Sequence, residues 1–381
     1  MKLGARLASL VVSDIRSMSR ACEAVSGINL GQGICDLPTP PPVARGAHEA
    51  IDKNQVVYTA PEGIAPLRAA IADKIRRAYG LEYDPASEVV VTSGATGGFA
   101  AACLSLFDPG DEIILFEPYY GYHLNTVITL GLTPVLVPTR PPDWAIDTEA
   151  LERAVSPRTR AVVVCSPANP SGKVWNTTEL DRLAAFCEEH DLIALTDEIY
   201  EHIVFDGEKH IPLATRGTAR SRTVMISGFS KTFAITGWRL GYLTAPPEMA
   251  RRITVANDLL YVCAPTPLQH AAVAGLSMPE SYFTDLSQSY ATKRDILCKA
   301  LEDAGLTPYW PKGAYYVLAD IRRLGAKNAK AAAMMLLERT KIASVPGTSF
   351  YADPVGDTLT RFCFAKEDDV LQEAARRLRA L

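Results

Sequence analysis

The sequence has no cysteine pair with metal-ligand spacing, no long apolar run and no excess of basic charge. Its eight cysteines are scattered without a CxxC pair, which argues against a zinc site or a secreted disulfide scaffold. No apolar run approaches the ~20 residues that span a bilayer, and the N-terminus lacks a signal-peptide core with a cleavage site. The net charge of −4 favours neither nucleic acid nor an anionic membrane as a partner. We therefore expect a cytoplasmic protein with reduced thiols and no bound metal.

The chain does have the length and apolar content of an ordinary globular protein with two domains. It has 381 residues, of which 48% are hydrophobic and 22% charged. Between about residues 88 and 245, apolar runs without alternation alternate with helix-like segments, a pattern typical of strands covered on both faces. The expected strands are 88–92, 112–116, 134–138, 159–165, 192–196, 223–227 and 239–244. This pattern predicts an α/β fold with a mostly parallel, helix-covered sheet.

From about residue 280 the pattern changes to that of a smaller α+β unit. Helices are expected over 281–304, over 329–340 and from residue 368, with strands within 313–320 and over 360–365. A proline-rich turn over 38–42 separates an N-terminal segment from the large domain. The expected division is an N-terminal arm and segment (1–45), a large domain (46–280) and a small C-terminal domain (281–381).

The chemistry of one segment, residues 227–242, stands out. It places Lys231 among small residues just after an apolar strand, with Arg239 eight residues further on. A lysine in such a packed turn is poorly hydrated, so its pKa should fall and its amine can attack an aldehyde. The planar fork of Arg239 suits a phosphate. Pyridoxal phosphate is a cofactor with both an aldehyde and a phosphate.

Other polar residues follow the ends of the expected strands. Residues 93–98 (SGATGG) open a helix whose free N–H groups suit a phosphate, without the GxGxxG dinucleotide pattern. Asp197 ends the strand 192–196, where its carboxylate can accept the pyridine N–H of the cofactor. Taken alone, each feature also fits a structural role, such as a turn, a helix cap or an arginine in solvent. Their combination and order along the chain favour a cofactor site.

The segment around Lys231 resembles the lysine motif of the class I/II aminotransferases, the fold-type I pyridoxal-phosphate enzymes that include aspartate, kynurenine and glutamine transaminases. Further matches follow in family order from about residue 15 to the C-terminus. The resemblance implies that Lys231 holds the cofactor as a Schiff base and moves a proton at the substrate Cα, that Asp197 holds the ring nitrogen, and that Tyr200 bonds the phenolate oxygen. The expected cofactor-binding residues are Tyr58, Ala95, Thr96, Tyr120, Asn169, Asp197, Tyr200, Ser230, Lys231 and Arg239.

The resemblance also implies how substrate and a second subunit are bound. Arg361 is expected to hold the substrate α-carboxylate, with Gly33 and Asn169 lining the same site. Tyr58 matches a tyrosine that reaches the phosphate of the neighbouring subunit, so a homodimer with shared active sites is expected. The N-terminal segment is expected to pack with the small domain.

The implied activity is transfer of the amino group of an L-amino acid to a 2-oxo acid, commonly 2-oxoglutarate in this family. Segments 14–20 and 28–33 resemble the kynurenine, glutamine and methionine branch, which slightly favours a neutral or aromatic donor over aspartate. Residues 34–37 (ICDL) replace the common Pro-Asp-Phe, and Ser166 replaces the first asparagine of the loop around Asn169. A role for the Cys35 thiol beside this loop is left open.

Two alternatives remain at this point. A C–S lyase or an aminocyclopropane-carboxylate-forming enzyme on the same scaffold would keep the same core residues. A non-catalytic ligand-sensing module is less favoured, because such modules usually follow a DNA-binding segment and no basic N-terminal extension is seen.

Overall fold

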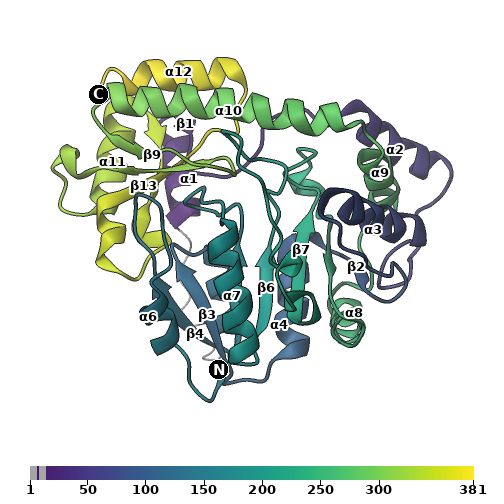
Figure 1. Cartoon of the computed structure of the whole chain (residues 1–381). Helices are drawn as coiled ribbons and strands as arrows, with labels where there is room; N and C mark the ends of the chain where they lie inside the picture. The colour runs from purple at the N-terminus through teal and green to yellow at the C-terminus, as the bar shows by residue number, and fades with distance from the viewer. Residues whose placement is uncertain (1–6, 8–13) are drawn as a thin grey trace, which may run out of the picture.

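A seven-stranded sheet forms the centre of the computed structural model, which describes residue 7 and residues 14–381 (Figure 1). Its strands lie in the order β2-β8-β7-β6-β5-β3-β4. Their bounds are β2 Val89–Thr92, β3 Glu112–Glu117, β4 Thr133–Pro138, β5 Thr159–Cys165, β6 Ile193–Asp197, β7 Thr223–Gly228 and β8 Gly241–Thr244. All the neighbouring pairs from β7 to β4 are parallel. The predicted α/β class with a mostly parallel sheet is therefore confirmed.

Strand β8 is the exception, and the sequence pattern did not reveal it. It pairs antiparallel with both β7 and β2, with Tyr242 opposite Ser227 on one side and Val91 on the other. The strand begins two residues later than expected. Arg239 has a φ of 53°, a left-handed conformation that an extended strand excludes. The chain therefore turns at Arg239, at the end of the loop between β7 and β8. Lys231 lies in the same loop.

Helices cover both faces of the sheet. Val163 and Val90 face one layer, formed by α4 (Gly94–Leu106), α5 (Gly121–Thr129) and α8 (Pro247–Tyr261). Val162 and Val164 face the opposite layer, with α6 (Thr148–Arg153) and α7 (Thr177–Glu189). Neighbouring residues of a strand thus bury opposite faces, which explains the apolar runs without alternation. Helices α2 (Pro41–Asp52), α3 (Ala65–Tyr79) and α9 (Thr266–Leu276) form a third cluster beside β2 and β8.

Two helix starts refine the sequence prediction. Helix α7 follows Asn176, whose side chain accepts from the Glu179 N–H while Glu179 reaches back to the Asn176 N–H, a capping box that pairs otherwise free N–H groups. Helix α2 begins at Pro41, so the end of the proline-rich stretch is helical rather than part of a turn. Proline suits the first turn of a helix because an N–H has no intrahelical partner there.

The C-terminal part forms a four-stranded antiparallel sheet in the order β12-β13-β10-β9. Its helices α10 and α12 pack on one another at the top of Figure 1. The N-terminal segment joins this part, since β1 pairs parallel with β11 and Met18 and Cys22 of α1 pack with Ala333 and Leu337. The division at residues 45 and 280 remains a prediction. The bounds are α1 Asp14–Ala24, β1 Ile28–Asn29, α10 Glu280–Asp303, β9 Thr307–Tyr309, β10 Tyr316–Asp320, α11 Ala329–Thr340, β11 Ile342–Ala343, β12 Val345–Pro346, β13 Leu359–Cys363 and α12 Asp368–Leu378.

Short 3₁₀ helices complete the described chain, at Leu213–Thr215, Ala219–Arg222, Thr236–Trp238, Arg322–Leu324, Gly347–Ser349 and Pro354–Thr358. Among the described residues, no helix is long and apolar enough to cross a membrane.

Candidate active site

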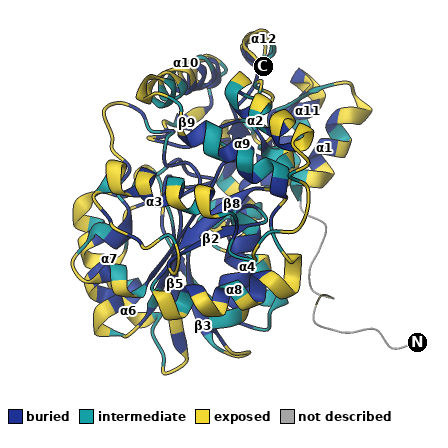
Figure 2. Ribbon diagram, turned by 90° about the vertical axis from the view of Figure 1, so that its right-hand side faces the viewer, coloured by how far each residue is buried: buried dark blue, intermediate teal, exposed yellow. Residues whose placement is uncertain are grey.

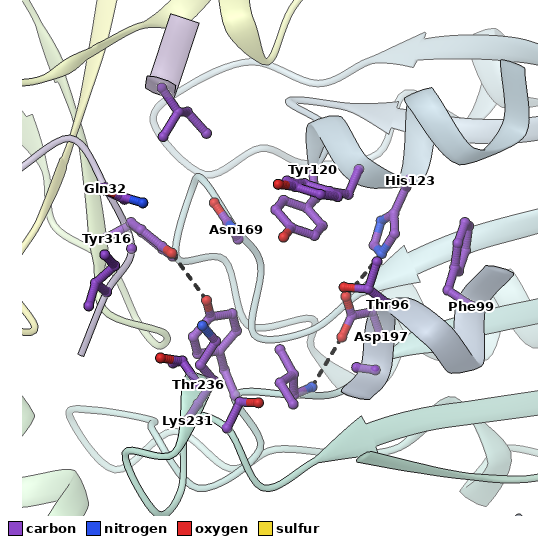
Figure 3. Close-up of a pocket in the computed structure, with 18 of the residues that line it drawn as sticks. Gln32, Thr96, Phe99, Tyr120, His123, Asn169, Asp197, Lys231, Thr236 and Tyr316 are labelled. Carbon is purple, nitrogen blue, oxygen red and sulfur yellow. Dashed lines mark hydrogen bonds and ion pairs between the residues drawn. The ribbon is translucent and has the colours of Figure 1, made fainter. Parts of the chain in front are cut away.

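A pocket of about 510 Å³ lies where the carboxyl ends of the parallel strands meet α1, the segment after β1, and the C-terminal sheet (Figure 3). Ligands of open α/β sheets bind at this edge, because the loops that follow the strands converge there. Of the twelve residues predicted for the site, eleven line the pocket; Tyr58 does not. The eleven are Gly33, Ala95, Thr96, Tyr120, Asn169, Asp197, Tyr200, Ser230, Lys231, Arg239 and Arg361.

Lys231 lies in the loop after β7, half-buried and close to two aromatic rings. Its Nζ is 5.9 Å from the centre of the Tyr200 ring and 5.4 Å from that of Tyr315. Burial removes water from the ammonium group and lowers the pKa of Lys231 to about 8, although the nearby Asp197 opposes this shift. Within the described part of the chain, no carboxylate forms an ion pair with this lysine. A lowered pKa of this kind makes the free amine available near neutral pH.

Asp197 is held at the end of β6 by two partners. His123 Nε2 lies 3.0 Å from Asp197 Oδ2, and the Ile199 N–H donates to Oδ1 at 3.2 Å. The Phe99 ring packs against the imidazole, with ring centres 4.5 Å apart, and the Tyr120 ring meets it edge-on at 5.2 Å. Figure 3 shows His123 and Asp197 facing each other along one wall. His123 was not predicted from the sequence, because a single histidine on a short helix carries no pattern that distinguishes it.

The first turn of α4 lies beside Arg239. The Ser93 side chain does not cap this helix, so the N–H groups near Ala95 and Thr96 are available to an anion. A Cβ on Gly94 would lie 2.4 Å from Arg239 Nη2, and one on Gly241 would lie 2.5 Å from the Ala95 nitrogen. Only glycine therefore lets the guanidinium and the β8 backbone approach the helix this closely. The result is a cradle of N–H donors and positive charge suited to a phosphate.

Arg361 is a buried guanidinium without a carboxylate partner among the described residues. It is 1% exposed, donates through Nη1 to Asn169 Oδ1 at 2.9 Å and through Nη2 to the Gly31 carbonyl at 2.7 Å. Its Nε has no partner. The Tyr316 ring lies beneath it, 4.2 Å from the guanidinium carbon. An uncompensated buried charge is destabilising, so this group is set up to receive an anion from outside the chain.

Tyr200 and Tyr316 join the two halves of the pocket. The Tyr200 hydroxyl donates to the Tyr316 hydroxyl at 3.3 Å, and burial raises the pKa of Tyr200 well above its usual value. A Cβ on Gly33 would lie 1.8 Å from the Tyr316 hydroxyl, so the pocket has room for that hydroxyl only because residue 33 is glycine. Tyr316, on β10, was not predicted, since its place in an apolar run is also that of a core residue.

Tyr58 and Cys35, both named from the sequence, lie outside the pocket, as does Glu198 beside Asp197. Tyr58 is 81% exposed. Cys35 is buried with its Sγ 3.2 Å from the Tyr290 hydroxyl. Glu198 pairs with His210 at 2.8 Å. The pocket residues that were not predicted for the site are Ile15, Arg16, Gln32, Ile34, Phe99, Tyr122, His123, Thr126, Ile199, Thr236 and Tyr316. The described residues contain no His, Cys, Asp or Glu cluster that could hold a metal.

The donor set of this pocket fits pyridoxal phosphate. It offers a lysine amine for the aldehyde, a carboxylate for the ring nitrogen, and the cradle at α4 for the phosphate. The volume is within the range of about 300–1,000 Å³ typical of small-molecule sites. Arg361, which has no carboxylate partner among the described residues, remains available to a substrate carboxylate after these groups are assigned.

Comparison with known proteins agrees with this geometry. Residues 25–378 match the family model of class I and II aminotransferases. The chain is 37% identical to N-succinyldiaminopimelate aminotransferase from Mycobacterium tuberculosis, whose solved structure superimposes with a TM-score of 0.96 over 100% of both chains. It is 32% identical to aromatic-amino-acid aminotransferase 2 of Thermococcus litoralis and to methionine aminotransferase of Escherichia coli, each over 99% of this chain and 97% of the relative.

These relatives act on different amino acids, as their names state, and share one fold. The chain therefore belongs to the class I and II aminotransferases and is a pyridoxal-phosphate-dependent transaminase of fold type I.

Proposed function

We propose that the eleven predicted residues that line the pocket carry out transfer of an amino group from an L-amino acid to a 2-oxo acid, with the roles predicted from the sequence. The observation that supports this most directly is Arg361, whose buried guanidinium has a free Nε and lacks a carboxylate partner among the described residues. A guanidinium binds a carboxylate through two parallel hydrogen bonds. Asn169 positions it, since its Oδ1 accepts from Arg361 and leaves its Nδ2 free to donate elsewhere.

When bound, pyridoxal phosphate supplies an electron-withdrawing ring that stabilises the electron pair left at the substrate Cα. Asp197, fixed by His123, keeps a proton on the ring nitrogen. Lys231 would take the proton from the substrate Cα as a free amine and, as an ammonium group, would deliver it to the former aldehyde carbon of the cofactor. A pKa of about 8 makes both forms of Lys231 accessible near neutral pH, as a general acid–base group requires.

The visible spectrum of the cofactor-loaded protein, mixed with single amino acids and no oxo acid, tests this proposal. Conversion of the bound cofactor to pyridoxamine phosphate is expected, with release of a 2-oxo acid. Release of ammonia or a thiol without conversion would instead indicate a lyase. Lys231→Ala should abolish turnover and leave the far-ultraviolet circular dichroism unchanged; wild-type activity in this variant would contradict the assignment.

A neutral or aromatic donor is the preferred substrate class. Apolar and aromatic side chains contribute to the pocket wall, including Ile15, Ile34, Phe99 and Tyr122. The ranking of donor rates in the same spectral assay tests this preference. Rapid conversion by aspartate with little conversion by aromatic or sulfur amino acids would overturn it.

We further propose that the protein acts as a cytoplasmic homodimer in which Tyr58 completes the partner's phosphate site. All eight cysteines are free thiols, which supports a reducing compartment. Figure 2 faces the side of the molecule that carries α2, α3, α8 and α9. Val57 and Tyr58 before α3, and Leu259 on α8, are 71%, 81% and 80% exposed. Large apolar side chains exposed to this degree suggest a covered surface.

Molecular mass in solution, measured by light scattering across a dilution series, tests the dimer. Leu259→Asp should shift the mass towards the monomer, whereas Val25→Asp, at an exposed valine after α1, should not. Tyr58→Phe should weaken cofactor binding without changing the mass. A monomeric wild-type protein with full activity would contradict both parts of this proposal.

A further inference from the structure

Four basic side chains line the pocket, against one carboxylate among the described residues. The basic groups are Arg16, Lys231, Arg239 and Arg361, and the carboxylate is Asp197. In the proposed function, Lys231 serves the cofactor aldehyde, Arg239 the phosphate and Arg361 the substrate α-carboxylate. One positive charge, that of Arg16, is left without an assigned partner.

Arg16 reaches the pocket from a different part of the chain than the cofactor residues. It is the third residue of α1, is exposed, and lines the pocket together with Ile15, Gln32 and Ile34. Within the described residues, no carboxylate forms an ion pair with it and no acceptor takes a hydrogen bond from it. Its guanidinium is therefore available to a ligand, with all five N–H donors free.

The helix that carries Arg16 is fixed to the rest of the site at both sides of this residue. Before it, Asp14 pairs with Lys330 on α11 at 3.2 Å and accepts from the Ser349 hydroxyl at 3.2 Å. After it, the Ser19 hydroxyl accepts from the Asn29 amide at 2.9 Å and contacts Gln32 at 3.3 Å. The backbone at Arg16 is thereby held against the segment after β1, which also lines the pocket.

We propose that Arg16 binds a second acidic group of the substrate, a carboxylate remote from the one held by Arg361. This inference rests on the proposed function and names a dicarboxylic compound as one of its substrates, either the donor amino acid or the acceptor 2-oxo acid. Two guanidinium groups on separate elements, one buried on β13 and one exposed on α1, select dicarboxylates by length as well as by charge. The apolar and aromatic side chains that also line the pocket, such as Ile15, Ile34 and Tyr122, remain suited to a neutral partner in the other half-reaction.

Binding of unreactive diacids to the cofactor-loaded protein tests the subsite without any turnover. A series from malonate to pimelate is titrated by calorimetry, with monocarboxylates of matching length as the reference. Wild-type protein is expected to prefer one diacid length. Arg16→Gln should lower the affinity ratio of that diacid to its monoacid by about 10- to 100-fold, the usual effect of losing a hydrogen-bonded charge partner. Arg16→Lys should restore part of the ratio. Arg20→Gln, an exposed arginine one turn further along α1, should leave it unchanged.

Separate half-reactions then show which substrate is dicarboxylic. The ratio of kcat/KM for glutamate or 2-aminoadipate to that for methionine reports on the donor, and the ratio for 2-oxoglutarate to that for a neutral oxo acid reports on the acceptor. Arg16→Gln should lower at least one of these ratios by about 10-fold or more. Equal losses for mono- and dicarboxylates, or no loss for either, would overturn the subsite. Failure of every amino acid to convert the cofactor of the wild-type protein would instead contradict the proposed function. The two failures can be distinguished, because the diacid titration measures binding and does not depend on turnover.

Discussion

His123 Nε2 lies 3.0 Å from Asp197 Oδ2, with both side chains buried at the end of the central sheet. The two residues lie 74 positions apart in the chain. Phe99 and Tyr120 pack against the imidazole, which supports its position beside Asp197 and orients the carboxylate. A carboxylate held in this way can face a ring nitrogen without losing entropy at each turnover.

Replacement of His123 by Phe should therefore lower kcat by about 10- to 100-fold, as expected for loss of one hydrogen bond to a charged group. The bound cofactor should also show an altered visible spectrum, since Asp197 is no longer oriented towards its ring nitrogen. His190→Asn, at a partly exposed histidine that pairs with Glu152, is the control. Unchanged kcat and spectrum in His123→Phe would show that Asp197 does not need this partner.

In the cofactor-free protein, removal of the Lys231 charge should stabilise the fold, by an amount that depends on pH. Burial lowers the pKa of Lys231 from 10.5 to about 8 in the folded state. Between these pKa values the unfolded chain binds a proton that the folded chain does not. The contribution of Lys231 to the free energy of unfolding therefore rises with pH in this range and is least favourable below pH 8. Lys231→Met should thus raise the melting temperature at pH 7, and the difference from wild type should shrink as the pH approaches 10. A constant difference across this range would contradict the shift.

Gly33 and Tyr316 should behave as a coupled pair. Gly33→Ala places a methyl 1.8 Å from the Tyr316 hydroxyl, which forces the ring away from Arg361. We expect a loss of about 1–3 kcal/mol in the free energy of unfolding, typical of overpacking, and a raised KM for the amino acid. Tyr316→Phe, added to Gly33→Ala, should restore part of the stability and of the KM. The closest remaining contact of the new methyl is then the ring carbon Cζ of residue 316, at 2.8 Å. Denaturant unfolding and KM values of the two single variants and the double variant measure the coupling; strictly additive effects would exclude it.

Gly94→Ala should weaken binding of the cofactor phosphate in particular. The added Cβ would lie 2.4 Å from Arg239 Nη2 and displace the guanidinium from the α4 cradle. The dissociation constant of pyridoxal phosphate should rise by about 10-fold or more, while that of pyridoxal, which lacks the phosphate, should change little. Gly80→Ala is the matched control, because Gly80 has a similar φ of 69° but no atom within 4 Å of the added Cβ. Equal weakening for both ligands would place the phosphate elsewhere.

Much of the fold was predictable from local patterns. The expected strands over 159–165 and 223–227 match β5 and β7 to within one residue, and the helix over 329–340 matches α11. Most side chains of these two strands are buried, as are Ala333, Leu336 and Leu337 of α11, so burial dominates their conformation. The antiparallel direction of β8 was not predictable, because an apolar run has the same composition in either direction. The start of α2 was missed because prolines fit both a turn and the first turn of a helix.

The local sequence pattern was sufficient to indicate the family and the proposed chemistry of the site. Lys231, Asp197, Asn169, Arg239 and Arg361 each follow or begin an apolar strand, and their order identifies the family. The tertiary structure decided which further side chains meet them: His123 from α5, Tyr316 from β10 and Arg16 from α1. These residues carry no local pattern that distinguishes them from core or surface residues. Their roles depend on distances across the pocket, which arise only when separate elements pack together.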